Sequence, residues 1–157
     1  MNEIRSVYDL LATAHVFAGL PQRMLEEVAG CGVLSRAEAR TVVCRAGAPA
    51  GTFNVIREGR VGIQIAAPGR GAITVATRGP GDAVEWSWLF PPFRWHFDAI
   101  TLEPVRLIEL DGVCLRGKCD RNADLGYQLM RRFAQIAIDD LQATRMQLLD
   151  VYGHVAS

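Results

Sequence analysis

Residues 41–65 read TVVCRAGAPAGTFNVIREGRVGIQI, and this stretch decides the fold. At its end, VGIQI at 61–65 alternates apolar residues with small or polar ones, the period-two pattern of a strand with one buried face. Two glycine-containing segments, RAGAPAG at 45–51 and REGR at 57–60, interrupt the apolar runs. Glycine and proline at such positions favour tight turns. The stretch therefore predicts short antiparallel strands joined by hairpins.

The same pattern continues on both sides of this stretch. ITV at 73–75 and VRL at 105–107 again alternate apolar and polar residues. Further turn segments, APGRGA at 67–72 and RGPGD at 78–82, separate the apolar runs. Many short strands with frequent turns are typical of a sandwich or barrel rather than of a parallel sheet. We therefore predict a mainly β domain over residues 34–111, flanked by helices.

Helical periodicity replaces the strand pattern at both ends of the chain. Residues 1–30 carry apolar side chains at three- and four-residue spacing, interrupted by the segment GLP, which predicts two short amphipathic helices. Residues 113–152 are also predicted to be helical, and most of them form one long helix. Asn122 or Asp120 is expected to cap the start of this helix, and Gly153 is expected to end it.

The long helix carries two apolar stripes. The first is confined to its first half, and we expect it to rest on the β domain; it comprises Leu125, Leu129, Phe133 and Ile136. The second alternates by three and four residues, as a coiled-coil seam does. Packing within the chain is one explanation, but the sequence supplies no second long helix, so we predict a homodimer. The predicted dimer interface comprises Ala134, Ala137, Leu141, Thr144, Leu148 and Val151.

Composition limits the classes of function. The 157 residues, half of them hydrophobic, suffice for a single domain over 1–157. Seventeen basic residues balance seventeen acidic ones, so net charge favours neither nucleic acid nor an anionic membrane as a partner. The sequence has no run of eighteen apolar residues and no apolar leader, so we expect a cytoplasmic protein. Because no recognition helix is predicted after Tyr152, DNA binding by this chain alone is not expected.

The reactive side chains do not form a recognisable catalytic or metal site. Cys31, Cys44, Cys114 and Cys119 lack the spacing of zinc or redox pairs, so we predict four ordinary buried or partly buried thiols. A lone histidine among aromatic residues, His96, is more often a packing residue than a ligand, and no metal is predicted. No G-x-S-x-G, P-loop or G-x-G-x-x-G motif is present. We therefore predict a protein that is not an enzyme.

Three segments resemble the cyclic nucleotide-binding domain of the catabolite activator and FNR superfamily. FAGLPQRMLEEVAG at 17–30 and the stretch 41–65 are similar to its opening, and 78–112 is similar to its phosphate-binding cassette and the strand after it. The resemblance covers about residues 17–152 and implies an antiparallel jelly roll with N-terminal helices and a long C-terminal dimerisation helix. Its motif residues are Gly47 and Gly59 in two turns and the apolar-aromatic run Phe53 to Ile56.

The cassette of this sequence departs from the family's pattern within residues 81–99, which hold all three tryptophans. In the family's cyclic AMP binders, an acid takes the ribose hydroxyl and an arginine takes the cyclic phosphate. Here Trp86 occupies the position of the acid and Trp95 that of the arginine, while Glu85 and Arg94 lie one residue away. We therefore do not expect unmodified cyclic AMP to bind. The candidate ligand-binding residues are Glu85, Trp86, Ser87, Trp88, Arg94, Trp95 and His96.

Two interpretations of the tryptophan-rich segment remain open. In the first, the pocket has collapsed and the rings fill it as core, since aromatic side chains bury large areas. In the second, the rings form a flat stacking surface for a different ligand, such as a nicotinamide or flavin nucleotide, a heme edge or a loop of a partner. The sequence does not name the cofactor.

Two hypotheses of function follow. The first is a non-catalytic regulatory module of the cyclic nucleotide-binding superfamily that senses a ligand and whose cyclic nucleotide pocket is changed or lost. The alternative is an accessory subunit that docks on a redox enzyme assembly and binds a nicotinamide nucleotide. Small proteins of this fold accompany NAD-linked nickel–iron hydrogenases, and the tryptophan-rich cassette resembles that group.

Overall fold

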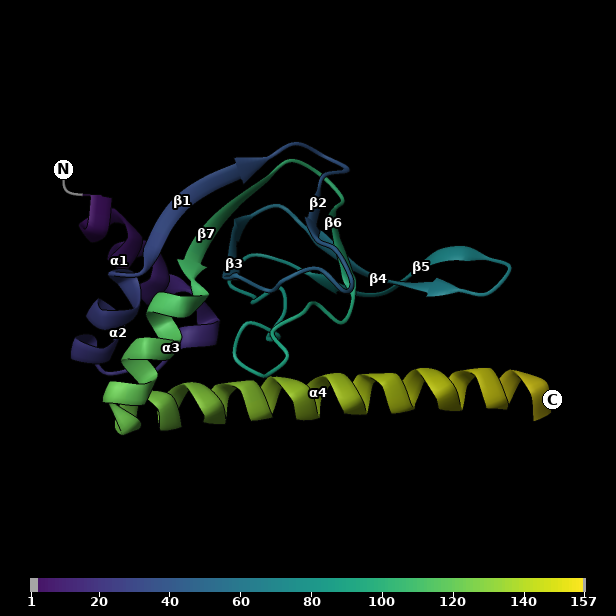
Figure 1. Cartoon of the computed structure of the whole chain (residues 1–157). Coiled ribbons are helices and arrows are strands. Elements are labelled where there is room, and N and C mark those ends of the chain that lie inside the picture. Colours follow the sequence, from purple (N-terminus) through teal and green to yellow (C-terminus); the bar gives the residue numbers. More distant parts are fainter. Residues whose placement is uncertain (1–2, 157) are drawn as a thin grey trace.

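The computed structural model describes residues 3–156, which form two β-sheets with helices packed at one end and one long helix running beneath them (Figure 1). The helices are α1 (Glu3–Thr13), the 3-10 turn η1 (His15–Phe17), α2 (Gln22–Ala29), α3 (Gly112–Arg121) and α4 (Ala123–Ala156). The strands are β1 (Gly32–Ala37), β2 (Val42–Cys44), β3 (Thr52–Glu58), β4 (Val61–Ala67), β5 (Gly71–Arg78), β6 (Asp98–Thr101) and β7 (Val105–Asp111).

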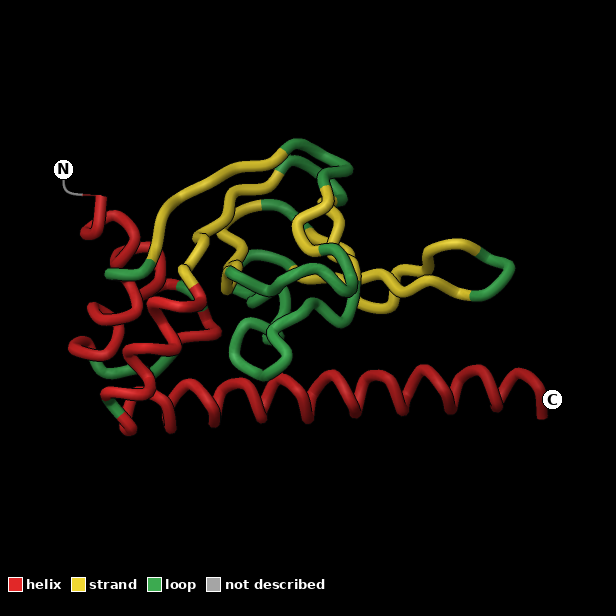
Figure 2. Tube along the Cα trace, viewed as in Figure 1, coloured by secondary structure: helices red, strands yellow, loops and turns green. Residues whose placement is uncertain are grey.

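Both sheets are antiparallel, and the predicted jelly-roll fold is confirmed. The three-stranded sheet has the order β1-β7-β3 and the four-stranded sheet the order β2-β6-β4-β5. Each of the predicted period-two segments lies in a strand, namely 61–65 in β4, 73–75 in β5 and 105–107 in β7. β4 and β5 form a hairpin whose far end projects beyond the rest of the sheets (Figure 2). The alternation of side chains in the sequence was therefore a sufficient signal for these strands.

The turn between β3 and β4 requires glycine. Gly59 has a φ of +89°, in the left-handed region that L side chains rarely adopt. A Cβ atom at this position would lie 2.5 Å from the carbonyl oxygen of Pro104. The predicted turn at REGR therefore forms because its glycine allows both the positive φ and the close approach of the chain before β7.

The helices form where the sequence predicts them, but some of their ends differ. Two helices are present before β1, although the first ends at Thr13 and is followed by η1 rather than continuing to the GLP segment. Asn122 caps α4, because its Oδ1 accepts a hydrogen bond from the backbone N–H of Leu125 at 3.3 Å. The predicted end at Gly153 is wrong, since α4 continues to Ala156. Glycine permits a left-handed stop but does not impose one, and a helical φ/ψ is equally open to it.

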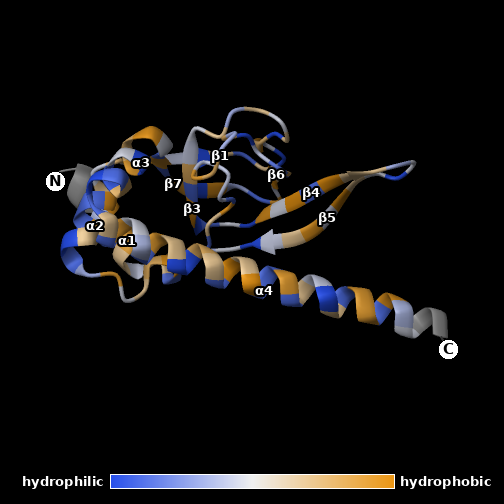
Figure 3. Ribbon diagram, turned by 60° about the horizontal axis from the view of Figure 1, so that its bottom comes forward, coloured by the Kyte–Doolittle hydropathy of each residue, from blue (hydrophilic) through white to orange (hydrophobic). Residues whose placement is uncertain are grey.

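The first apolar stripe of α4 is buried, as predicted, and Phe133 packs on Phe53 of β3 and on Trp88. Leu125, Leu129 and Phe133 are buried, and Ile136 packs against the core. The second stripe is exposed, and every residue from 141 to 153 is exposed. Figure 3 shows hydrophobic segments continuing along α4 beyond the point where the sheets cover it.

The prediction of four ordinary thiols is wrong for Cys31 and Cys114, which form a disulfide across 83 positions of sequence. Cys31 precedes β1 and Cys114 lies in the first turn of α3. The backbone N–H of Asp111 donates a hydrogen bond to the carbonyl oxygen of Cys31 at 2.9 Å, so the end of β7 brings the two cysteines together. Their spacing along the chain carried no signal, because the sheet register creates the contact. Cys44 and Cys119 are free.

Candidate functional site

The tryptophan-rich segment crosses the β domain as an irregular connection between β5 and β6. Its start is fixed by β3, because the N–H of Gly81 donates to Ile56 at 2.7 Å and the N–H of Val84 donates to Asn54 at 2.9 Å. Its end is fixed by the turn before β3. There the N–H of Trp95 donates to Ala48 at 3.0 Å. The segment therefore lies in a defined position although it contains no helix or strand of its own.

Two of the three tryptophans belong to the core. The side chain of Trp88 is fully buried and stacks on Phe53, with ring centroids 5.1 Å apart and an interplanar angle of 15°. Phe133 of α4 meets Trp88 edge to face at 5.9 Å. Trp95 is also buried, at 6% exposed. Trp86 is only partly buried, and it packs on the same cluster with its ring 4.7 Å from that of Phe53.

Beside this cluster lies a hollow of about 170 Å³, here called the cassette hollow. It lies between the tryptophan-rich segment, the β4–β5 hairpin and the middle of α4. Its lining residues are Ile63, Arg78, Val84, Glu85, Trp86, Ser87, Phe90, His96, Phe97 and Asp140.

Three polar side chains of the cassette hollow contact one another. Ser87 Oγ donates a hydrogen bond to Glu85 Oε1 and lies 2.8 Å from His96 Nδ1. His96 Nδ1 lies 3.7 Å from Glu85 Oε1. The second carboxylate oxygen, Glu85 Oε2, is buried without a hydrogen-bond partner among the described residues. A buried carboxylate oxygen without a donor is costly, so this atom is suited to accept a hydrogen bond from a ligand.

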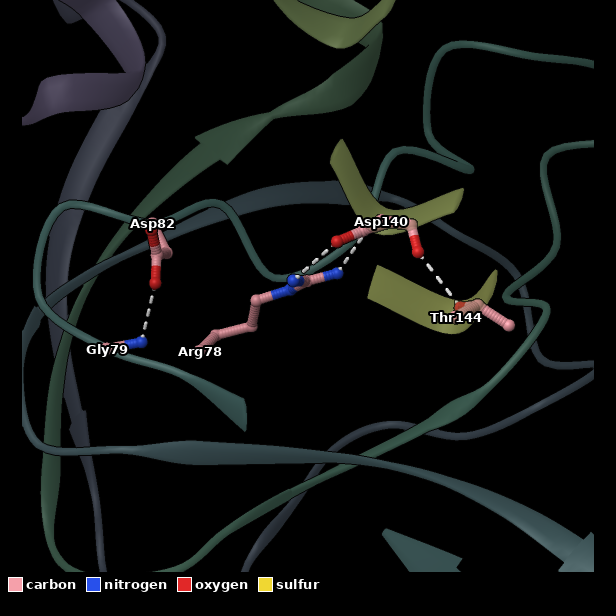
Figure 4. Close-up of polar contacts among 5 residues, drawn as sticks. All are labelled: Arg78, Gly79, Asp82, Asp140 and Thr144. Carbon is pink, nitrogen blue, oxygen red and sulfur yellow. Dashed lines mark hydrogen bonds and ion pairs between the residues drawn. The ribbon is translucent and has the colours of Figure 1, made fainter. Parts of the chain in front are cut away.

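The guanidinium of the cassette hollow is already paired. Arg78 at the end of β5 donates from its two terminal nitrogens to the carboxylate of Asp140 on α4, at 3.0 and 2.7 Å (Figure 4). This bidentate geometry is the strongest form of the arginine–carboxylate pair. The Arg78 side chain is 20% exposed, and the pair connects two residues 62 positions apart in the chain.

The loop between Arg78 and the cassette is held by a carboxylate as well. Asp82 Oδ2 accepts a hydrogen bond from the backbone N–H of Gly79 at 2.8 Å (Figure 4). Its other oxygen lies 2.7 Å from Nε2 of His15, in the 3-10 turn after α1. Figure 4 also shows Thr144 donating to the backbone carbonyl of Asp140, at 2.9 Å, within α4. This bond uses the polar atom of Thr144 within its own helix.

The structure brings together some of the predicted ligand-binding residues and separates others. Glu85, Trp86, Ser87 and His96 line the cassette hollow. Trp88 and Trp95 are buried in the core, and Arg94 is exposed and donates to the carbonyl of Gly47 at 2.8 Å. The sequence interpretation missed the lining residues Ile63, Arg78, Val84, Phe90, Phe97 and Asp140. The sequence did carry a signal for Asp140. It belongs to an acidic pair, Asp139–Asp140, in an otherwise apolar part of the long helix.

The free thiol near this region, that of Cys44, is buried. Burial raises the pKa of the Cys44 thiol, and the negative charge of Glu85 raises it further. The thiol therefore stays protonated at neutral pH, and the thiolate is the reactive form.

Among the residues whose positions are described, no group of three or more His, Cys, Asp or Glu side chains gathers at a place that could hold a metal ion. No helix of the described residues is both long and apolar enough to cross a membrane.

Comparison with known proteins gives one family. A family model for the cyclic nucleotide-binding domain matches residues 34–122. No curated protein sequence matches the chain. The solved structures add a candidate cyclic nucleotide-binding protein from Geobacter metallireducens, with a TM-score of 0.75 and 23% identity over 90% of this chain and 99% of that chain.

Two further solved structures share the fold. A cyclic nucleotide-binding domain from Methylobacillus flagellatus has a TM-score of 0.77 and 14% identity, covering 94% of this chain and 83% of that one. The regulatory domain of Toxoplasma gondii PKA, solved with cAMP, has a TM-score of 0.72 and 17% identity. The match to the Toxoplasma gondii domain covers 87% of this chain and 50% of that chain.

Proposed function

The chain belongs to the cyclic nucleotide-binding domain family, and from this premise we propose that it is a non-catalytic regulatory module whose ligand is not unmodified cyclic AMP. Domains of this family are generally regulatory and non-catalytic. The proposal concerns the cassette hollow, which is lined by four of the predicted site residues.

One observation carries the proposal: the guanidinium that lines the cassette hollow is bound on both terminal nitrogens by Asp140. A cyclic phosphate needs a free cation or several backbone donors. Trp95 stands at the position of the family's arginine and is buried, while Arg94 donates to a backbone carbonyl elsewhere. A phosphate entering the hollow would have to displace Asp140 from Arg78, and the displaced carboxylate would repel it.

The remaining chemistry of the cassette hollow favours a ligand that has a hydrogen-bond donor and a flat ring. Glu85 Oε2 is buried and unpartnered among the described residues, so it suits a ligand hydroxyl or N–H. Trp86, Phe90 and Phe97 supply aromatic surface beside it. We infer that the ring and sugar of a nucleotide such as a nicotinamide nucleotide enter here, with its phosphates outside the hollow.

Titration of the intrinsic tryptophan fluorescence with cyclic AMP, cyclic GMP, NADH and NADPH tests this proposal, with calorimetry as a check where the ligand itself absorbs. We expect saturable binding of a nicotinamide nucleotide and none of cyclic AMP up to about 1 mM. Glu85→Gln should weaken the binding about tenfold or more, because it removes a charged acceptor.

The matched control for this variant is Glu103→Gln, which changes the same charge at a partly exposed turn position outside the cassette hollow. It should leave the affinity unchanged. Tight binding of cyclic AMP to the unaltered protein would contradict the proposal. If none of the four compounds changes the fluorescence, the proposed nicotinamide nucleotide ligand is contradicted. The interpretation in which the tryptophan rings fill a collapsed pocket would then remain.

We also propose that the module is a homodimer that pairs through α4. The six predicted interface residues, Ala134 to Val151 at alternating spacing, are all exposed in the single chain. The three largest, Leu141, Leu148 and Val151, are 49%, 51% and 60% exposed. Apolar side chains exposed along a seam of this length are typical of a helix that packs on another helix.

Light scattering after size exclusion is expected to give twice the mass of the 17.2 kDa chain. Leu141→Glu should shift the protein toward the mass of one chain, because two like charges would meet at the centre of the seam. Gln142→Glu introduces the same charge at an exposed position beside the seam and should leave the dimer intact. The dimer proposal would be overturned if the unaltered protein has the mass of one chain. It would also be overturned if the two variants lower the measured mass equally.

The alternative hypothesis of an accessory subunit on a redox enzyme assembly finds no support in the similar proteins, and the cytoplasmic location stays a prediction. Capture of a partner enzyme from native cells together with a flat nucleotide titration would favour that alternative.

A further inference from the structure

A second hollow, of about 390 Å³, lies on the three-stranded sheet and is lined by arginines from all three of its strands. Arg36 comes from β1, Arg57 from β3 and Arg106 from β7. We call it the arginine hollow; its lining residues are Leu34, Ser35, Arg36, Arg57 and Arg106. It shares no lining residue with the cassette hollow.

The sheet register explains why the arginines meet. Arg36 and Arg106 are direct cross-strand partners in the pairing of β1 with β7. Cross-strand partners point to the same face, and like charges directly opposite each other destabilise a sheet. On the other side of β7 the register shifts between Ile56 and Glu58, so Arg57 is the extra residue of a bulge. Bulges redirect a side chain, and this one brings the third guanidinium to the hollow.

The positive charge of the arginine hollow is only weakly compensated. Glu58 Oε2 lies 3.5 Å from Arg106 Nε, but the two side chains are 63% and 52% exposed, and exposed pairs of this kind contribute little. Among the side chains that the structure describes, neither Arg36 nor Arg57 forms an ion pair. No carboxylate lines this hollow, although Arg36 and Arg106 also line a neighbouring hollow together with Glu38 and Glu58.

A second and independent observation points to a ligand. Nε of Arg57 is buried and has no hydrogen-bond partner among the described residues. An unpaired buried donor on a charged group is costly unless a ligand satisfies it. The same residue also lines a hollow at the end of α1, together with Leu10 and Ile108. Arg57 therefore lies between the two hollows, with its unpartnered Nε on the buried part of the side chain.

We propose that the arginine hollow binds a soluble anion that carries phosphate groups. Planar guanidinium groups donate in pairs to phosphate oxygens, and three of them match a compound with two or more negative charges. Such a ligand removes the repulsion between Arg36 and Arg106 and satisfies Nε of Arg57. This site is separate from the cassette hollow, and its occupation does not depend on the ligand proposed there.

Isothermal titration with inorganic pyrophosphate, at low salt and at physiological salt, tests the site. We expect one saturable binding event per chain, weaker at higher salt because exposed charges are screened. Arg57→Gln and, separately, Arg36→Gln should each weaken the binding about tenfold or more, since each removes a charged donor. Arg36 is exposed, so its variant tests the site without loss of the fold.

The matched control is Arg70→Gln, which removes the same charge at the exposed turn between β4 and β5. It should bind pyrophosphate like the unaltered protein, and so should Glu85→Gln in the cassette hollow. Absence of saturable binding by the unaltered protein would overturn the proposal. An equal loss in Arg70→Gln and Arg36→Gln would also overturn it, because it would mean that only net charge matters.

Discussion

Replacement of Trp88 by alanine is expected to lower the free energy of unfolding by about 4 kcal/mol. The Trp88 ring is fully buried, stacks on Phe53 and meets Phe133 of α4 edge to face. The substitution removes this buried surface and leaves a cavity between the cassette segment, β3 and α4. Urea denaturation followed by circular dichroism measures the change, and the signal without urea shows whether the total helix content is retained.

Two variants serve as controls for this prediction. Phe90→Ala removes an aromatic side chain from the same segment, but Phe90 is 43% exposed, so the loss should stay below about 1 kcal/mol. Trp88→Phe keeps a ring in the core and removes the indole N–H, which is buried without a partner among the described residues, so its cost should be far smaller than that of alanine. Equal losses for Phe90→Ala and Trp88→Ala would show that Trp88 is not part of the core.

Removal of the Cys31–Cys114 disulfide is expected to cost about 4 kcal/mol of stability, because the cross-link lowers the conformational entropy of the unfolded chain. The two cysteines lie 83 positions apart, so the disulfide closes a loop of more than half the chain. The cost grows with the length of the closed loop. Thermal unfolding of Cys31→Ser and of the unaltered protein, each with and without a reductant, measures it.

Cys119→Ser is the control, because Cys119 is a free thiol in the same helix as Cys114. It should leave the sensitivity to reductant unchanged, whereas Cys31→Ser should abolish it. No change in unfolding temperature on reduction of the unaltered protein would contradict the prediction. The presence of this disulfide also bears on the location of the protein, since disulfides are rare in cytosolic proteins. A count of free thiols in freshly isolated protein therefore also tests the predicted cytoplasmic compartment.

Much of the fold could be predicted from the sequence because it depends on local periodicity. The alternation in VGIQI at 61–65 predicted a strand, and β4 forms there with Val61 and Ile63 buried, although Ile65 is 40% exposed. The first stripe of the long helix likewise predicted which of its residues are buried, and Leu125 and Leu129 are buried. The end of the long helix at Gly153 was predicted wrongly. Glycine allows a left-handed stop, but it also allows the helical conformation that continues through it.

The candidate site was predicted only in part. Glu85, Ser87 and His96 are close in sequence, and the structure brings them into contact. Trp88 and Trp95 were candidates for the same surface, but both are buried. A cluster of aromatic residues in a sequence is expected both in a core and at a binding surface. Only the packing of the folded chain distinguishes the two cases.

The sequence by itself predicted the succession of helical and strand regions, the turn at Gly59, the buried stripe of the long helix and the family. The tertiary structure alone decided that Arg78 pairs with Asp140, that Cys31 meets Cys114 and that Arg36 faces Arg106. The physical reason is that periodicity fixes the direction of a side chain relative to its own element. Which distant side chain it meets depends on sheet register and on the packing of α4, and these are set by the whole core at once.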